Sequence, residues 1–476
     1  MELLPFYDES FVDNFSRFEN SKSSRRVFRS SRRGSPEAPA RTELRAWGGG
    51  RMALLYRATR LRDRADTHVF VFVVTRSATR DPDRDVTSKD FCCAHQRWAV
   101  AFSRHDDALG ESETRGNRFP MSPAITIAVR AGVYLVWRGG GEGVRVYADF
   151  AFTLLSRDHF SANEGFSGEQ VRFSAGRLAQ GRGRCVPLRE LSTRFADSRG
   201  EFQLELAMSR VRTLYSCELR APRLESAPVA FAGYDWAVAL SANGEALRLV
   251  RLSGGSARCR ARYALAAAAG DRRAHSGPLE HVCDAEDSAP AWTVGRWLAS
   301  AAAARGSGLR LTLELVWARA LAEVRVPLAG SAAACYDRDR QAWALRCDTH
   351  SDSVRLHMLY RDVHHVPRNH LRYVSWSAWL VSDTGNTDST EDAVPLPGAP
   401  FSHYYAQENA DEGLMMETPL SMREASAPGC RFVHTGATGG SGELLVRLEW
   451  SECYLLFQAT YHIYDDLCRR HGHQMR

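Results

Sequence analysis

The fold is decided by residues 90–102 (DFCCAHQRWAVAF), followed after an interval by residues 132–138 (GVYLVWR). A tryptophan followed by alternating apolar residues, a polar interval and a second apolar run is typical of two neighbouring strands in a half-buried antiparallel sheet. The stretch therefore predicts a β-sheet with one face packed against a core.

The same pattern occurs twice more along the chain. Residues 234–240 (YDWAVAL) precede residues 246–252 (ALRLVRL), and residues 341–347 (QAWALRC) precede residues 354–360 (VRLHMLY). A pattern that occurs three times in the same order indicates internal duplication. We therefore expect three related units, each built around one tryptophan.

Each unit also closes in the same way, with an alternating apolar run after Gly200, Gly308 or Gly442. Short strands separated by turn residues, with few helical stretches, predict β-sandwiches. Short helices are expected only near residues 188–195 and 294–304. The fold class is thus all-β, with tandem antiparallel sandwiches, and 476 residues suit three domains better than one core.

These patterns divide the chain into a tail at residues 1–45 and sandwiches at residues 46–222, 223–330 and 331–476, the last being divergent. The tail is expected to be disordered, because residues 17–33 carry seven basic side chains against Glu19 alone. A nuclear-import patch or a docking motif are the alternatives for it. Residues 111–131 have no counterpart in the other units, so they are either an inserted hairpin or an error in the gene model.

Composition limits the classes of function. The net charge is +6, and Lys22 and Lys89 are the only lysines. Eleven cysteines without Cys-x-x-Cys spacing, and no apolar N-terminal segment, indicate neither a disulfide framework nor secretion. The longest apolar runs have the length of strands, so no membrane insertion is expected. A cytoplasmic or nuclear protein is predicted.

The order of the strand patterns resembles that of the MATH domain, also known as the TRAF-C domain. This family's eight-stranded antiparallel sandwich is shared by meprins, receptor-associated TRAF proteins and substrate-recruiting subunits of cullin ubiquitin ligases. The resemblance is good over about residues 66–219, fair over residues 226–328 and mainly architectural over residues 333–466. It implies tandem MATH-like sandwiches.

In that family, the sandwich binds an extended peptide in a shallow groove across one sheet. The resemblance implies that Tyr134 and Phe150 match the aromatic residues of the groove, and that Val171 stands where another aromatic residue is common. Arg182 and Arg184 lie in what corresponds to the adjoining loop, where ligase-type relatives carry Trp and Phe. Two arginines there would favour an acidic or phosphorylated ligand. Packing in the sandwich core is the alternative role for Tyr134 and Phe150.

Catalytic and metal sites are not indicated. His364, His365 and His370 lie close in sequence to Asp362, but no cysteine with ligand spacing is near them, so surface histidines are expected. Cys92 and Cys93 are adjacent on a predicted strand and should point to opposite faces. No glycine-rich phosphate loop opens a helix. We therefore expect no catalytic residue, no cofactor and no metal.

The sequence thus predicts a non-enzymatic adaptor that binds peptides or partner proteins, recruiting substrates to a ubiquitin ligase or assembling signalling complexes. No small-molecule substrate is expected. One alternative is a structural scaffold in which the units pack against each other and leave no free groove. Association with nucleic acid through the arginine-rich tail is another. It is disfavoured because the other arginines alternate with acidic residues instead of forming one stripe.

Overall fold

The computed structural model describes residues 53–61, 67–76, 86–107, 128–254, 258–283, 291–304, 308–337, 339–349, 352–382, 393–409, 413–434 and 442–457. The predicted tail at residues 1–45 lies outside the described residues. So does most of the stretch at residues 111–131. The described part is mostly β, in several antiparallel sheets, as the sequence predicts.

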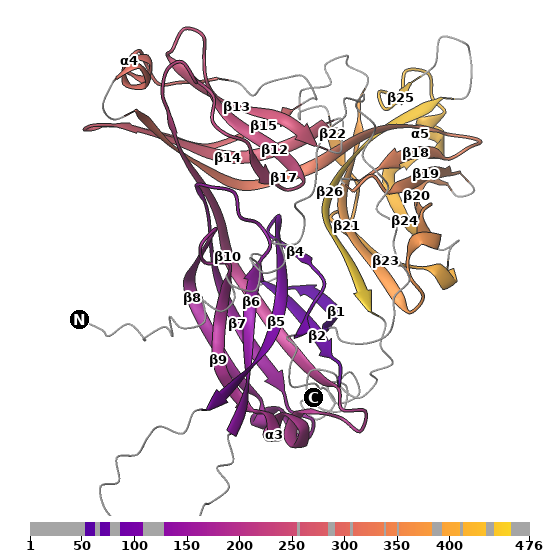
Figure 1. Cartoon of the computed structure of the whole chain (residues 1–476). Coiled ribbons are helices and arrows are strands. Elements are labelled where there is room, and N and C mark those ends of the chain that lie inside the picture. Colours follow the sequence, from indigo (N-terminus) through magenta and orange to yellow (C-terminus); the bar gives the residue numbers. More distant parts are fainter. Residues whose placement is uncertain are drawn as a thin grey trace, which may run out of the picture.

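Three smaller sheets are each built from one stretch of the chain (Figure 1). The first has the order β3-β5-β6-β9, with β4 beside β5, the second β11-β12-β13-β16 and the third β18-β19-β20-β24. Their bounds are β3 Val86–Thr87, β4 Phe91–Cys93, β5 Gln96–Asp107, β6 Ala128–Trp137, β9 Ala179–Pro187, β11 Val229–Phe231, β12 Tyr234–Leu240, β13 Ala246–Gly254, β16 Trp292–Thr293, β18 Ala333–Tyr336, β19 Ala342–Asp348, β20 Ser353–Tyr360 and β24 Leu414–Ser421.

A fourth sheet of 13 strands joins the three stretches, with the order β1-β2-β10-β17-β26-β21-β22 and side branches. Its bounds are β1 Ala53–Arg60, β2 His68–Val74, β7 Val144–Leu155, β8 Glu164–Ser174, β10 Phe202–Leu219, β14 Arg258–Ala269, β15 Arg272–Cys283, β17 Leu309–Pro327, β21 His370–Val381, β22 Ala393–Pro395, β23 Phe401–Ala406, β25 Val433–His434 and β26 Glu443–Phe457. Each smaller sheet faces one part of this long sheet, which gives a sandwich-like architecture.

The long strands β10 and β17 hold the parts together. The first half of β10 pairs with β2, its last residues, 213–219, pair with β17, and β7 pairs along most of its length. In the same way, β17 pairs with β10 through residues 309–315 and with β26 through residues 321–327. The predicted boundaries at residues 222 and 330 follow the ends of these strands, yet both strands also pair with the next part of the chain.

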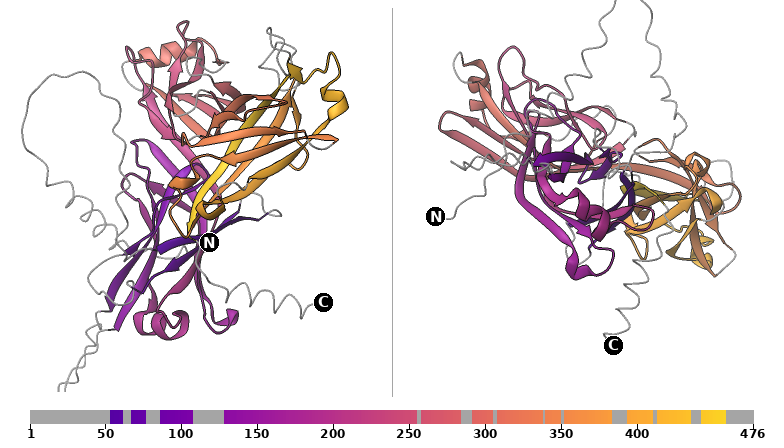
Figure 2. Two further views of the ribbon diagram at one scale, coloured as in Figure 1. Left: turned by 90° about the vertical axis from the view of Figure 1, so that its right-hand side faces the viewer. Right: turned by 60° about the horizontal axis from the view of Figure 1, so that its bottom comes forward.

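The third part of the chain also returns to the first. In Figure 2, the yellow strand β26 approaches the indigo strand β1. The rings of Phe70 on β2 and Tyr454 on β26 have centroids 5.8 Å apart, and Tyr454 is buried. The residues of the first two parts share one hydrophobic core with Tyr454 and Leu456, whereas most of the third part has a core of its own.

The tryptophans of the three sequence patterns, Trp98, Trp236 and Trp343, are fully buried. The indole N–H of Trp98 donates to the carbonyl of Cys93 at 3.1 Å, and that of Trp236 donates to the carbonyl of Phe231 at 3.2 Å, five residues back in both cases. The indole N–H of Trp343 instead donates to a side chain, the Asp337 carboxylate, at 3.1 Å. In each hairpin, the buried indole N–H therefore has a hydrogen-bond acceptor from a residue close in sequence.

A buried serine fixes the same strand in the first two parts. The backbone N–H of Val100 donates to the Ser88 hydroxyl at 2.9 Å, and that of Val238 donates to the Ser226 hydroxyl at 3.0 Å. Both serines also bond to the backbone of the same strand residue, with N–H to carbonyl distances of 2.8 and 2.9 Å. The hydroxyl thus replaces a sheet partner for a buried backbone N–H.

Replacing Ser226 with alanine is expected to lower the free energy of unfolding by about 1–3 kcal/mol, because the N–H of Val238 is then left buried without its acceptor. Chemical denaturation monitored by circular dichroism measures the change. Ser192 is the matched control, since its exposed hydroxyl bonds only to the carbonyl of Arg189. Ser192→Ala should stay within about 0.5 kcal/mol of the original protein. Equal effects of the two substitutions would contradict the assigned role of Ser226.

Helices are few and short. The expected helical stretches are present as α3 (Leu188–Glu190), which continues into a single wide turn at Leu191–Phe195, and as α4 (Trp297–Ala303). A third, α5 (Met422–Ala425), is capped by Ser421 and Glu424. Within the described ranges, no helix has both the length and the apolar character needed to cross a membrane.

Candidate functional site

Tyr134 lies on β6 and is 3% exposed. It packs with Ala99, Ala101 and Val136 in a small cluster that is separate from the main core. Its hydroxyl is 2.9 Å from Nε2 of His105. The ring is therefore on the face of its sheet that points away from the core, as the groove prediction requires, but it is buried.

The interpretation of residues 181–184 as a loop is wrong. All four lie within β9, which pairs with β6. A Cβ at Gly181 would be 2.7 Å from the Tyr134 Cα, and one at Gly183 would be 2.8 Å from the Tyr134 hydroxyl. The close approach of Tyr134 thus explains the glycines, and the strand continues through them with a register shift opposite Gly132.

Phe150 and Val171 lie in the main core, 5% and 7% exposed. They come from the paired strands β7 and β8, and a Cβ at Gly168 would contact both of them. The ring of Phe150 packs against that of Phe152 at 5.7 Å and that of Phe173 at 6.5 Å. The structure therefore brings Phe150 and Val171 together, and it places Tyr134 in a different cluster on a different sheet.

Arg182 and Arg184 are exposed on β9. The Arg182 guanidinium lies over the Phe166 ring, 5.2 Å from its centroid, so the arginine also covers an apolar edge of the sandwich. Binding of a peptide by Tyr134, Phe150, Val171, Arg182 and Arg184 stays a prediction. The core positions of Phe150 and Val171 agree with the packing alternative.

The side chains considered for chemistry are the histidines near Asp362 and the two adjacent cysteines, and His364 and His365 lie on the short helical turn Val363–His365. The rings of His364 and His365 are 4.0 Å apart, and Nδ1 of His365 is 3.9 Å from Asp362. Among the described residues, no group of three or more His, Cys, Asp or Glu side chains is placed to hold a metal ion. Cys92 is half-buried and Cys93 is buried, as their alternation on β4 predicts. Burial raises the pKa of the Cys93 thiol, which keeps it protonated.

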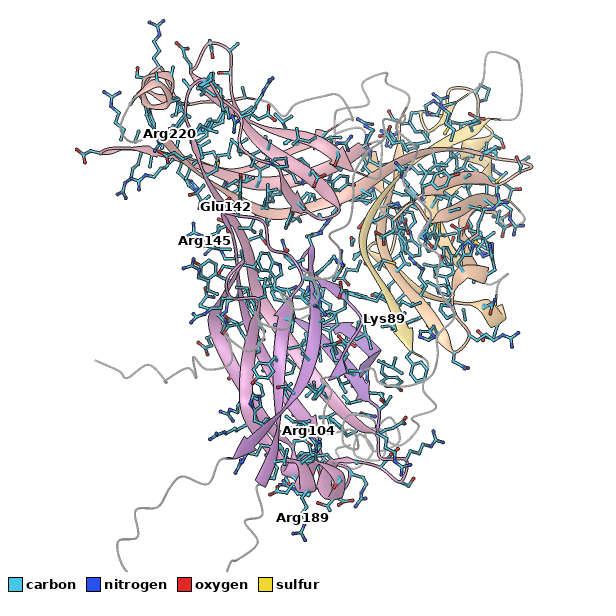
Figure 3. The ribbon with its side chains drawn as sticks, viewed as in Figure 1. Lys89, Arg104, Glu142, Arg145, Arg189 and Arg220 are labelled. Atoms are coloured by element: carbon cyan, nitrogen blue, oxygen red, sulfur yellow. The ribbon has the colours of Figure 1, made fainter. Side chains whose placement is uncertain are left out.

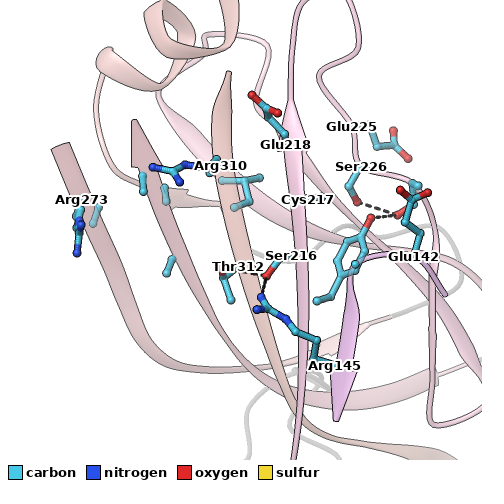
Figure 4. A pocket seen from close by; sticks show the side chains of 18 of the residues that line it. Glu142, Arg145, Ser216, Cys217, Glu218, Glu225, Ser226, Arg273, Arg310 and Thr312 are labelled. Carbon is cyan, nitrogen blue, oxygen red and sulfur yellow. Dashed lines mark hydrogen bonds between the residues drawn. The ribbon is translucent and has the colours of Figure 1, made fainter. Parts of the chain in front are cut away.

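A large groove lies across the long sheet where the first two parts of the chain meet (Figure 4). Its volume is about 1140 Å³, and its floor crosses β10, β17, β14 and β15. One row of cross-strand partners on this floor is Ser216, Thr312, Ala266 and His275. The next row is Glu218, Arg310, Ala268 and Arg273.

The side chains in the centre of the groove floor are small. Ala266, Ala268 and Thr312 are half-buried, whereas the alternating residues Ala267 and Leu311 belong to the core beneath them. Side chains of a strand alternate between its two faces, so the small residues point into the groove. A ligand backbone can approach the sheet closely there.

One wall of the groove is formed by the connection that follows β10. The Tyr215 hydroxyl donates to the carbonyl of Ala227 at 2.9 Å, and the Ser226 hydroxyl donates to the same carbonyl at 3.0 Å. Cys217 also lines the groove, but burial raises the pKa of its thiol to about 11. A protonated thiol is a poor nucleophile, so the groove is suited to binding and not to thiol chemistry.

Charged side chains of both signs line the groove. Arg273 and Arg310 lie on the side of β14, β15 and β17, and Glu142 and Glu225 lie on the other side in Figure 4. Glu218 is the cross-strand partner of Arg310, and Arg223 lines the groove from the same connection as Glu225. Arg145 donates to the Ser216 hydroxyl at the lower end. Figure 3 places Glu142 and Arg145 where the first part of the chain approaches the second, at the opposite end from Arg189. The groove can therefore orient a ligand that carries both charges.

Sequence reasoning missed this groove. Its residues come from the ends of four strands that are paired only through the long sheet, and no spacing in the sequence reports that pairing. One signal was present in the sequence, because the alternate residues 264, 266 and 268 are all alanine. A strand face made only of small residues indicates that another backbone can approach it closely.

Neither a protein-family model nor a curated protein sequence matches this chain.

Proposed function

We propose that this chain is a non-enzymatic protein-binding adaptor that holds an extended peptide in the groove across β10, β17, β14 and β15. In this proposal the chain consists of three tandem MATH-like sandwiches, and the groove belongs to the junction of the first and second. The groove, whose floor has small side chains and whose rim carries both arginine and glutamate side chains, is the observation that carries the proposal.

Two observations support tandem repetition. The small sheets have corresponding orders, with β5-β6-β9, β12-β13-β16 and β19-β20-β24 at equivalent places. The first two parts also share the hydrogen bonds of Trp98 and Ser88 with those of Trp236 and Ser226, at the same separations in sequence. Independent origins would not reproduce both the strand order and the side-chain bonds, so duplication of one sandwich accounts for them best.

The chemistry of the groove defines its ligand. The side chains of an extended peptide alternate, so successive residues can face the two sides of the groove. Acidic or phosphorylated side chains would pair with Arg273 and Arg310. Basic or hydroxyl side chains would face Glu142 and Glu225. Such a peptide could come from a substrate of a ubiquitin ligase or from a signalling partner.

A structural scaffold is the second candidate function. It is favoured by the continuous long sheet and by the burial of Tyr134, which leaves this ring closed to a ligand. The scaffold requires no ligand in the groove. Binding of a peptide there decides between the two candidates.

Enlarging the floor of the groove is expected to abolish peptide binding. Peptides are selected from a display library of short random sequences on the intact chain, and their affinity is measured by fluorescence polarisation. Ala266→Tyr should weaken the affinity by more than about tenfold, because its ring occupies the space of the peptide backbone. Arg310→Ala should weaken the affinity for acidic or phosphorylated peptides by about tenfold and should reduce the affinity for neutral peptides less.

The chain offers a matched control for each variant. Ala334→Tyr places the same ring at an exposed strand position in the third part. Arg272→Ala removes an arginine that is next to Arg273 in sequence but is not part of the groove lining. Both should bind the selected peptides as the original protein does. A library without a selected peptide, or peptides that bind Ala266→Tyr and Ala334→Tyr equally, would favour the scaffold.

A further inference from the structure

A second cavity, of about 500 Å³, lies where all three parts of the chain meet. Its lining comes from β1, β2, β4, β8, β10, β17 and β26, and from the turn between β4 and β5. Cavities of this size hold small organic molecules. This cavity is distinct from the groove described above, with no lining residue in common.

The three long strands all break their regular pairing at this cavity. The register of β10 shifts between Ser209 and Arg212, which makes Arg210 and Val211 extra residues. The register of β17 shifts at Val316, and that of β26 shifts at Ser451. All four extra residues line the cavity. Bulges change the direction of side chains and are common beside binding sites. Bulges of three strands at one cavity therefore indicate a binding site and not only a bend in one strand.

Backbone strain is also concentrated here. Gln170 has a φ of 50° and Arg210 a φ of 49°, and both line the cavity. Such left-handed conformations are unfavourable for residues other than glycine and are kept where the surrounding structure enforces them, often at ligand sites. Ala94 and His95, which also line the cavity, have φ of 47° and 65°, but they form the two-residue hairpin turn that requires such values.

Four arginines give the lining its charge. Arg60, Arg210, Arg212 and Arg319 line the cavity, and among the described residues Glu452 is the carboxylate in the lining, 3.9 Å from the Arg60 guanidinium.

The carboxylate partners of three of these arginines stand outside the lining. Arg210 is paired with Asp149, Arg212 with Glu314 at 2.8 Å and Arg319 with Glu449 at 2.8 Å. These ion pairs fix the directions of the arginine side chains, which remain 30% to 58% exposed. A guanidinium held by a carboxylate behind it still presents further N–H groups, which match the oxygens of a phosphate.

The lining also offers an apolar surface. The Arg319 guanidinium stacks on the Trp317 ring, 4.7 Å from its centroid. Val316 is 44% exposed, although it is a large apolar residue on a strand. Val316 and Trp317 line the cavity together with Val211. A ligand with a phosphate at one end and an apolar or ring portion at the other would match both kinds of surface.

We propose that this cavity binds a small organic phosphate, with the phosphate oxygens on Arg60, Arg212 and Arg319 and the organic portion against Val316 and Trp317. The ligand is held and not transformed. Because its contacts come from strands of all three parts, bound ligand stabilises their arrangement.

Isothermal titration calorimetry on the intact chain tests the proposal with pyrophosphate, adenosine triphosphate and inositol hexakisphosphate as probes. At least one probe should bind with one site per chain, and it should raise the melting temperature. Arg212→Ala should weaken its affinity at least about tenfold. Glu452→Gln should strengthen it several-fold, because the substitution removes a negative charge from the lining.

Two further variants separate a built site from general attraction to a basic surface. Arg355→Ala removes an arginine that pairs with Glu417 at 2.9 Å, far from the lining residues in sequence and in a different sheet, and should leave the affinity unchanged. Arg212→Lys keeps the positive charge but loses the planar guanidinium, whose N–H groups can donate two parallel hydrogen bonds. It should still weaken binding several-fold. No binding of any probe, or equal weakening by Arg355→Ala and Arg212→Ala with folds unchanged by circular dichroism, would overturn the proposal.

Discussion

Replacing Trp98 with alanine is expected to lower the free energy of unfolding by about 3–5 kcal/mol. The side chain is fully buried, and its ring meets that of Phe173 edge-on with centroids 5.0 Å apart. Alanine would leave a cavity between the first small sheet and the long sheet, and it would leave the carbonyl of Cys93 without its indole donor. Chemical denaturation monitored by circular dichroism measures the loss.

Trp317 provides the comparison for this prediction. It lies on β17, is half-buried and carries the Arg319 guanidinium on its ring. Trp317→Ala should cost about 1 kcal/mol, because it opens no enclosed cavity. Trp98→Phe should have an intermediate effect, since it keeps part of the packing. The assigned role of Trp98 would be untenable were Trp98→Ala no more costly than Trp317→Ala.

The second large effect is expected at Glu449, whose side chain is 2% exposed on β26. It pairs with Arg319 of β17 at 2.8 Å and with Arg260 of β14 at 3.3 Å, and these two arginines are themselves cross-strand partners. Glu449→Gln removes the charge that both arginines share. Breaking a buried ion pair from one side typically costs 3–5 kcal/mol, and the partial exposure of the arginines lowers our expectation to about 2–3 kcal/mol. Denaturation in low and high salt measures the effect.

Glu417 is the matched carboxylate for this test. It pairs with Arg355 at 2.9 Å, but its side chain is 51% exposed. Glu417→Gln should cost less than about 1 kcal/mol, and added salt should reduce that cost further. The Glu449 contribution should depend little on salt, because the group is buried. Similar costs and similar salt dependence at the two positions would show that the Glu449 cluster does not tie the second and third parts together.

Much of the fold could be predicted from local patterns. The alternation around Trp98, Trp236 and Trp343 predicts antiparallel strands with buried tryptophans, and the structure has both. The burial of these side chains follows from the two-residue period of a strand, and this period can be read from residues that are close in sequence. The same period places Cys92 and Cys93 on opposite faces.

The candidate sites could not be predicted in the same way. Alternation says that Tyr134 and Phe150 each face one side of a strand, but not that they belong to different clusters. Residues 181–184 have the composition of a loop, yet the approach of Tyr134 makes them part of β9. Such outcomes depend on partners that are distant in sequence.

The sequence by itself determined that the chain is built from antiparallel strands and which tryptophans its cores enclose, because both follow from hydrophobic periodicity within a few residues. Only the tertiary structure decided that β10 and β17 also pair with strands of the next part of the chain, and that their junctions create a groove and a cavity lined by arginines. The physical reason is that pairing register and bulges arise between strands, from residues that are distant in the chain. The contact between Arg212 and Glu314 joins residues more than a hundred positions apart.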